Sequence, residues 1–162
     1  MSDITIREPA SPDDLVALHK LLLVMGQEVA RAPVNPAKVM QVLVHAVSHP
    51  DAYTVLMAMD DGDLVGALCL AKSDFWYSDD AFLSDLFFFV LPQHRGGEAM
   101  PALIAAAEQI GAAADLQVIL TINNPRRQRG SRAKFERVAT LQSFSPAGVV
   151  LSLGEICVLR QQ

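Results

Sequence analysis

The feature that most restricts the fold is a strand-like segment, a helical segment and a second strand-like segment in succession. Residues 81–91, "AFLSDLFFFVL", form an apolar strand, and residues 116–122, "LQVILTI", form another. Between them, residues 96–114 are rich in alanine, and their larger apolar side chains recur at helical spacing: Leu103, Ile104 and Ile110. A strand–helix–strand unit joins parallel neighbours by a right-handed crossover. This region therefore predicts a sheet with a parallel pair covered by a helix.

The rest of the chain supplies further strands and helices. Ser11-Pro12 and Asn35-Pro36 each predict the start of a helix, with a capping side chain followed by proline. Alternation and apolar runs predict strands at 3–8, 52–60, 64–72, 148–153 and 155–160, and a short basic helix is expected at 131–143. The expected order is β-α-α-β-β-β-α-β-α-β-β. The predicted fold class is α/β (α+β), a mixed, mostly antiparallel sheet flanked by helices, in a single domain over residues 1–162.

Composition excludes several classes of protein. Half of the 162 residues are hydrophobic, which is inconsistent with a largely disordered chain. The apolar runs are shorter than the ~20 residues of a membrane span, and "MSDITIREPA" lacks the apolar core of a signal peptide. Cys69 and Cys157 lie far apart in apolar segments, and no Cys/His spacing suggests zinc. We therefore expect a cytoplasmic protein without a metal site.

A phosphate site is expected where the strand at 81–91 meets the helix at 96–114. Arg95-Gly96-Gly97 stands between Pro92 and the alanine-rich segment. Glycine permits backbone conformations that other residues avoid, and the first turn of a helix presents unpaired N–H groups and the positive end of its dipole. A tight turn with a solvated arginine is the alternative. The flanking strand and helix favour the phosphate site.

The stretch Val90-Leu91-Pro92-Gln93-His94-Arg95-Gly96-Gly97, in this order of elements, resembles the GNAT superfamily of N-acetyltransferases. The Arg-Gly-Gly variant looks most like the phage and bacterial members. The resemblance implies acetyl-CoA as co-substrate, with its pyrophosphate on backbone amides of the turn and its pantetheine arm along the preceding strand. The residues so assigned are Phe89, Val90, Leu91, Arg95, Gly96, Gly97, Glu98, Ala99 and Met100.

The resemblance also concerns catalysis. Many members take a general base from the strand that contains Asp85, and a charge in that apolar run needs a partner or solvent. The family usually has glycine where this chain has Glu98 and Met100, and a general-acid tyrosine where it has Ala139. The expected activity is direct transfer of acetyl from acetyl-CoA to an amine. The alternative is a non-catalytic acyl-CoA-binding or protein-interaction domain.

Charge and aromatic residues suggest the partners. Six of the thirteen basic residues lie between Arg126 and Arg137, and the rest of the chain is acidic. Arg126, Arg127 and Arg129 are candidates for the 3′-phosphate of CoA, with a solvated face as the alternative. The loop 75–80, "FWYSDD", either folds onto the core or walls a pocket for a cationic acceptor. We expect a small-molecule or peptide amine acceptor, no nucleic acid and no membrane; a homodimer is compatible with the sequence.

Overall fold

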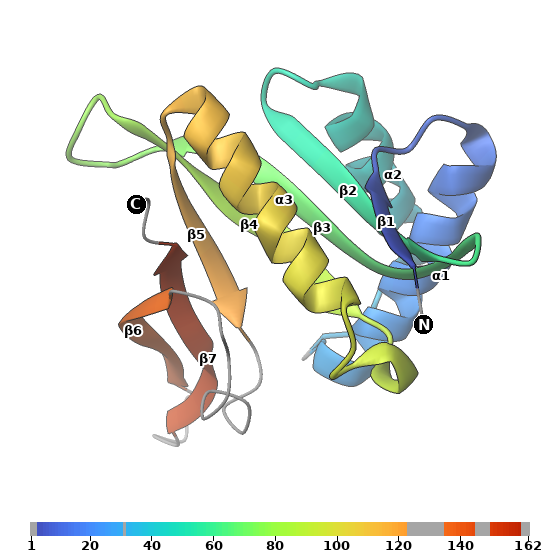
Figure 1. The fold of residues 1–162 in the computed structure, drawn as a ribbon. Helices are drawn as coiled ribbons and strands as arrows, with labels where there is room; N and C mark the ends of the chain where they lie inside the picture. Colours follow the sequence, from blue (N-terminus) through green and yellow to red (C-terminus); the bar gives the residue numbers. More distant parts are fainter. Residues whose placement is uncertain (1–2, 31, 123–134, 145–149, 160–162) are drawn as a thin grey trace.

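The computed structural model describes residues 3–30, 32–122, 135–144 and 150–159, the last two ranges as backbone only (Figure 1). The helices are α1 (Pro12–Val29), α2 (Pro36–Ser48) and α3 (Ala99–Ala114), with a short 3₁₀ turn, η1 (Pro92–His94). The strands are β1 (Ile4–Arg7), β2 (Tyr53–Asp60), β3 (Asp63–Asp74), β4 (Ala81–Val90), β5 (Gln117–Ile122), β6 (Phe135–Phe144) and β7 (Val150–Leu159).

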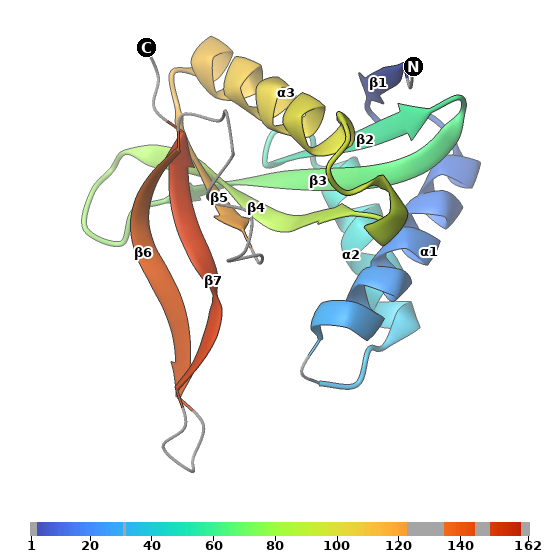
Figure 2. The same ribbon diagram turned by 60° about the horizontal axis from the view of Figure 1, so that its bottom comes forward.

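The described strands form one sheet in the order β1-β2-β3-β4-β5-β7-β6. The pair β4–β5, which α3 connects, is parallel, and the other five pairs are antiparallel. The prediction of a mixed, mostly antiparallel sheet flanked by helices is confirmed. The β6–β7 hairpin extends away from the body of the molecule (Figure 2).

The predicted order of elements is wrong near its end. The helix expected at 131–143 is absent from the described part of that range, where β6 runs from Phe135 to Phe144 and pairs with β7. Register shifts after Arg137 and after Leu141 interrupt the alternation by which a strand is recognised. Pairing with β7 provides backbone hydrogen bonds that outweigh a weak local preference for helix. The two strands expected at 148–153 and 155–160 are a single strand, β7, because Gly154 lies inside it and pairs with Leu141.

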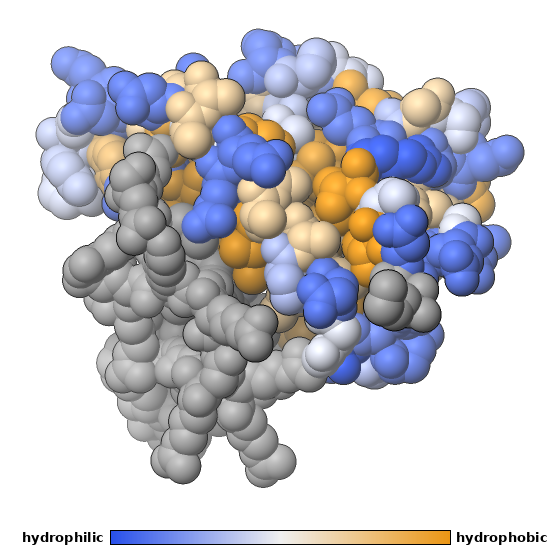
Figure 3. Space-filling view, in the orientation of Figure 1, coloured by the Kyte–Doolittle hydropathy of each residue, from blue (hydrophilic) through white to orange (hydrophobic). Residues whose placement is uncertain are grey.

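Alternating side chains of the strands divide the core into two clusters. On β2, Val55 and Met57 pack with α1 and α2, while Leu56 and Ala58 pack with α3. Helices α1 and α2 therefore cover one face of the sheet and α3 covers the other (Figures 1 and 2). Apolar residues also gather over α3 and between it and β1 on the outer surface, with hydrophilic residues around them (Figure 3).

A β-bulge in β4 changes which face its side chains occupy. Cys69 pairs with Phe87 and Leu70 with Asp85, so Leu86 is an extra residue on β4. Without it, Leu83 and Phe87 would lie on the same face, since they are an even number of residues apart. Instead Leu83 packs with α3, and Phe87 packs with α1 and α2. The bulge lies next to Asp85, and the Leu86 side chain is half exposed.

The start of α1 is held by one carboxylate. Asp14 accepts hydrogen bonds from both terminal nitrogens of Arg7 (2.8 and 2.6 Å) and from the backbone N–H groups of Ala10 (2.8 Å) and Ser11 (3.2 Å). The Ser11 hydroxyl in turn accepts from the N–H of Asp14, which completes a capping box. The Arg7 guanidinium, followed by the Ala10 N–H, lowers the pKa of Asp14 well below its usual range. Asp14 thus ties β1 to α1.

We predict that Asp14→Asn lowers the free energy of unfolding at pH 7 by about 1–2 kcal/mol, because the ion pair with Arg7 is lost and the hydrogen bonds from the Ala10 and Ser11 N–H groups no longer have a charged acceptor. A carboxyl whose folded pKa is lowered stabilises the protein above its unfolded pKa and loses that effect as pH falls toward the folded pKa. The difference between the two proteins should therefore shrink below about pH 4. Urea unfolding at several pH values measures it. Asp13→Asn, at the exposed neighbouring carboxylate, is the matched control, and an equal effect of both substitutions would contradict the assignment.

Candidate functional site

The parallel strands β4 and β5 are paired over only part of their length. Phe82, Leu83 and Ser84 pair with Gln117, Val118 and Ile119. Beyond these residues β4 continues to Val90, while β5 pairs with β7 from Ile119 to Ile122. No described strand pairs with β4 beyond Ser84 on the side away from β3. We call this backbone, from Asp85 to Val90, the open edge of β4.

The ladder with β3 shows which backbone groups face the open edge. Gly66 on β3 is paired with Val90 on β4. The N–H of Leu91, the residue after Val90, donates to the carbonyl of Val65, the residue before Gly66 (2.9 Å). Val90 is therefore in a non-hydrogen-bonded pair, and its own N–H and carbonyl point away from β3. By alternation the same holds for Phe88, while Phe89 bonds to β3. The N–H and carbonyl groups of Phe88 and Val90 thus face this edge.

Asp85 lies where the two strands separate. Its Oδ1 atom accepts a hydrogen bond from the backbone N–H of Thr121 on β5 (2.7 Å), so the side chain takes the place of a backbone partner. Burial raises the pKa of Asp85 above its usual value, and the hydrogen bonds from Thr121 act in the opposite direction. A carboxylate with a raised pKa at the end of an unpaired strand edge has the properties of a general base.

The Arg95-Gly96-Gly97 turn leads directly into an uncapped helix. Gly96 has φ of 91°, a conformation that L side chains rarely adopt. No side chain caps α3, and Pro101 lacks an N–H. Within the described residues, no acceptor binds the N–H groups of Gly96, Glu98, Ala99 and Met100. These donors at the positive end of the α3 dipole are suited to an anion.

The side chains around this turn point in different directions. The Glu98 carboxylate is exposed and makes no ion pair with a described residue. Ala99 is buried in the cluster beneath α3, and Met100 packs against that cluster. A Cβ on Gly97 would have the His94 carbonyl oxygen, at 3.4 Å, as its nearest neighbour. The surface over Gly97 is therefore open.

The Arg95 side chain braces the turn instead of facing the free N–H groups. Its terminal nitrogens donate to both carboxylate oxygens of Glu28 on α1 (2.6 and 2.7 Å), and its Nε donates to the Val90 carbonyl (3.0 Å). The guanidinium also lies 5.1 Å from the centre of the Phe89 ring. This pairing lowers the pKa of Glu28. Arg95 thus occupies one acceptor of the open edge and fixes the turn to α1.

His94 is turned toward the β2–β3 hairpin. Its Nδ1 is 3.6 Å from Oδ2 of Asp60, whose Oδ1 is buried and has no hydrogen-bond partner among the described residues. Sequence reasoning identified neither Asp60 nor Glu28 nor Thr121 as neighbours of the turn and of Asp85. Glu28 is 67 residues from Arg95 and Thr121 is 36 residues from Asp85, and no local pattern connects residues at such separations.

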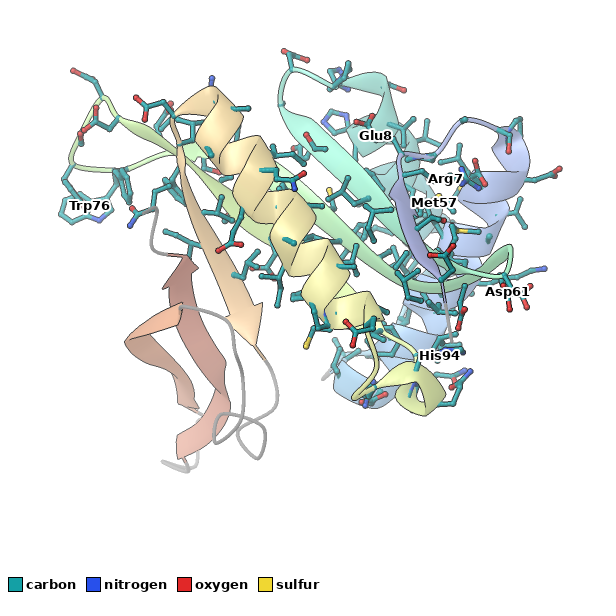
Figure 4. The ribbon with its side chains drawn as sticks, viewed as in Figure 1. Arg7, Glu8, Met57, Asp61, Trp76 and His94 are labelled. Atoms are coloured by element: carbon teal, nitrogen blue, oxygen red, sulfur yellow. The ribbon has the colours of Figure 1, made fainter. Side chains whose placement is uncertain are left out.

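Other candidates lie apart from this site or outside the described residues. Arg126, Arg127 and Arg129 are outside them, and Ala139 is on β6, described as backbone only. The loop 75–80 is at the tip of the β3–β4 hairpin, at the opposite end of β4 from the turn, and Figure 4 shows Trp76 far from His94. It does not wall the open edge.

The described residues contain neither a cluster of metal ligands nor a membrane-spanning helix. No group of three or more His, Cys, Asp or Glu side chains there is placed to hold a metal ion. None of the helices in that part of the chain combines the length and apolar character needed to cross a membrane.

The sequence model described as the acetyltransferase (GNAT) family matches residues 24–136. No curated protein matches the chain. Solved structures share the fold at low identity. A GNAT-family protein from Desulfovibrio desulfuricans has a TM-score of 0.68 at 18% identity, over 97% of this chain and 98% of that chain. Arabidopsis thaliana NAA60, solved with a bisubstrate analogue, has a TM-score of 0.66 at 17% identity, over 96% of this chain and 95% of that chain. A PaiA N-acetyltransferase from Thermoplasma acidophilum, in complex with coenzyme A, has a TM-score of 0.62 at 14% identity, over 98% of this chain and 99% of that chain.

We predict that Cys69 is unreactive in the folded protein. The thiol is buried, and burial, with the charge of Asp85, raises its pKa to about 12. In a Cys157→Ser background, a thiol reagent at pH 8 should react with the native protein at least roughly a hundredfold more slowly than with the urea-unfolded protein, because the thiolate is the reactive form. Comparable rates in the two states would show that the thiol is accessible and ionised.

Proposed function

The chain belongs to the acetyltransferase (GNAT) family, and from this premise we propose that it transfers acetyl from acetyl-CoA directly to an amine. The observation that carries the proposal is the open edge of β4, which has Asp85 at one end and the uncapped α3 at the other. One continuous backbone surface thereby offers hydrogen bonds for an extended arm, donors for an anion and a base. Acetyl-CoA has an extended pantetheine arm that ends in a pyrophosphate, and this arrangement suits it.

The pyrophosphate is proposed to bind the free N–H groups of Gly96, Glu98, Ala99 and Met100, with Gly97 open to it. The pantetheine arm is proposed to lie along Phe89, Val90 and Leu91, where the ladder makes Phe88 and Val90 the residues whose backbone groups face it. Arg95 contributes to this site through the backbone of the turn, since its guanidinium is paired with the Glu28 carboxylate. Arg126, Arg127 and Arg129 remain the proposed contacts of the 3′-phosphate. The coenzyme A and bisubstrate complexes of the Thermoplasma and Arabidopsis proteins support acetyl-CoA as the co-substrate.

In the proposed reaction the amine nitrogen attacks the thioester carbonyl carbon. Asp85 accepts the proton that the nitrogen loses, directly or through a water molecule. Backbone N–H groups of the open edge stabilise the negative charge on the carbonyl oxygen. The C–S bond then breaks, and the thiolate of CoA takes a proton from solvent, because the chain has Ala139 in place of the tyrosine that the family resemblance implies. The acceptor is a small-molecule or peptide amine.

A non-catalytic acyl-CoA-binding domain is the second candidate function, and Ala139 favours it. Ala139 provides no general acid, so the leaving thiolate receives no proton from that position. The two candidates share cofactor binding and differ in the consequence of removing Asp85, so binding and turnover have to be measured separately.

We predict that the protein binds acetyl-CoA and that Gly97→Val weakens binding by about ten- to a hundredfold, the loss of one or two charge-assisted hydrogen bonds. Calorimetric titration measures the affinity. The fold should tolerate the substitution, because a Cβ at this position makes only an ordinary contact with the His94 carbonyl. An unchanged melting temperature without ligand is the control. No binding by the unmodified protein at millimolar acetyl-CoA would exclude the proposed function.

We predict that Asp85→Asn lowers the rate of acetyl transfer by at least roughly a hundredfold, the usual contribution of a general base. Asparagine keeps an oxygen that accepts from the Thr121 N–H, so the strand geometry should persist. Release of free CoA thiol with a panel of amines measures the rate. Glu108→Gln, which neutralises an exposed carboxylate on α3, is the control. Undiminished turnover would exclude Asp85 as the base, and no turnover by either protein despite acetyl-CoA binding would support the non-catalytic alternative.

The stability of the same variant tests the state of Asp85. A carboxyl with a raised folded pKa holds its proton more tightly in the folded state. The protein therefore loses stability as pH rises from the unfolded pKa, about 3.9, to the folded one. Asp85→Asn removes this loss, so at pH 7 the variant should be at least as stable as the unmodified protein.

A further inference from the structure

The β3–β4 hairpin presents aromatic side chains to solvent. Trp76 is 94% exposed and Tyr77 is 68% exposed, the largest values among the exposed large hydrophobic side chains of the described residues. They stand with Phe75 at the end of the hairpin, and we call these three residues the aromatic tip. Buried aromatic area contributes strongly to folding, so a tryptophan left in solvent is available for a contact outside the chain.

The rings of the aromatic tip contact one another and β4. Phe75 packs on Phe82 of β4, with ring centroids 4.4 Å apart, and stacks on Tyr77 at 5.4 Å. Trp76 contacts the Tyr77 ring edge-on at 5.4 Å. The backbone of the turn is closed by the hydrogen bond from the Phe75 N–H to the Asp80 carbonyl (3.2 Å). Of the three rings, Phe75 thus connects the tip to β4, while Trp76 and Tyr77 remain exposed to a partner.

Three carboxylates flank these rings in the sequence. Asp74, Asp79 and Asp80 are exposed, and none forms an ion pair with a described residue. Lys72, on β3, is the one basic side chain in the described stretch 70–90. The surface therefore combines the negative faces of aromatic rings with negative charge, a combination that attracts cations.

We propose that the aromatic tip, with Asp74, Asp79 and Asp80, is a docking site for a lysine- or arginine-rich segment of a partner protein. A cationic side chain stacks on Trp76 or Tyr77, and neighbouring cations pair with the carboxylates. Trp and Tyr are the residues on which protein interfaces most often depend. A membrane surface is disfavoured, because three carboxylates repel anionic lipids, and nucleic acid is disfavoured for the same reason.

This site is separate from the proposed acetyl-CoA site. The aromatic tip precedes Ala81, and the Arg95-Gly96-Gly97 turn follows Val90. The ten residues of β4, about 30 Å of extended chain, lie between them. The docking site therefore goes beyond the proposed function, and either one can fail without the other.

The chain contains one tryptophan, so its fluorescence reports on the tip directly. Titration of the protein with a hexa-arginine peptide should give a saturable change in Trp76 emission, with affinity reduced roughly tenfold between 50 and 300 mM salt, because exposed charges are screened. Hexa-glutamate should give no change. A lack of response to hexa-arginine below millimolar concentration would overturn the proposal.

Substitutions locate the binding. Tyr77→Ala, and Asp79→Asn with Asp80→Asn, should each weaken hexa-arginine binding at least roughly threefold, and Glu108→Gln should leave it unchanged. Calorimetry gives the corresponding loss for Trp76→Ala, which removes the fluorophore. Binding that survives all of these substitutions would place the cation elsewhere and overturn the proposal. A response to phosphatidylcholine vesicles but not to the peptide would assign the tip to a membrane instead, against the proposal.

Acetyl-CoA titration of Trp76→Ala distinguishes this inference from the proposed function. The variant should bind acetyl-CoA as the unmodified protein does, since the tip does not contribute to the open edge. A reduced acetyl-CoA affinity of Trp76→Ala would contradict the separation of the two sites.

Discussion

The early end of the β4–β5 ladder is the constraint on which the candidate site depends. A parallel pair that continued past Ser84 and Ile119 would use the backbone groups of β4 internally and leave none for a ligand. The Asp85 carboxylate occupies the point of separation and accepts from the Thr121 N–H, so the first unpaired donor of β5 is satisfied there. On its other edge, β5 pairs with β7 from Ile119 to Ile122. The cost of burying Asp85 appears as its raised pKa.

In the proposed acetyl-CoA site, the charged residue of the Arg95-Gly96-Gly97 turn supports the turn without contacting the anion. Arg95 is bound by Glu28, by the Val90 carbonyl and against the Phe89 ring. Its charge is therefore compensated within the protein, and the anion is left to backbone N–H groups and the α3 dipole. The same contacts connect the turn to the C-terminal part of α1. Displacement of α1 would thus be felt directly at the turn.

The bulge at Leu86 links the core to the site. Two clusters of apolar side chains need opposite faces of β4, and the inserted residue gives Leu83 to one cluster and Phe87 to the other. The same irregularity is next to Asp85, where the strand leaves its parallel neighbour. Packing of α1, α2 and α3 on the sheet therefore also fixes the position of the candidate base.

Local patterns in the sequence determined α1, α2, α3, most strands and the glycine turn, because these follow from the spacing of apolar residues, from turn residues and, for α1 and α2, from capping residues. They also marked Asp85 as an anomalous charge in an apolar strand. They did not determine β6, since its alternation is broken by two register shifts and its stability comes from β7. The tertiary structure alone decided that β4 and β5 separate, that Thr121 meets Asp85 and that Glu28 binds Arg95. Hydrogen-bond partners of strands and side chains are chosen between distant segments, and only the packed chain brings such segments together.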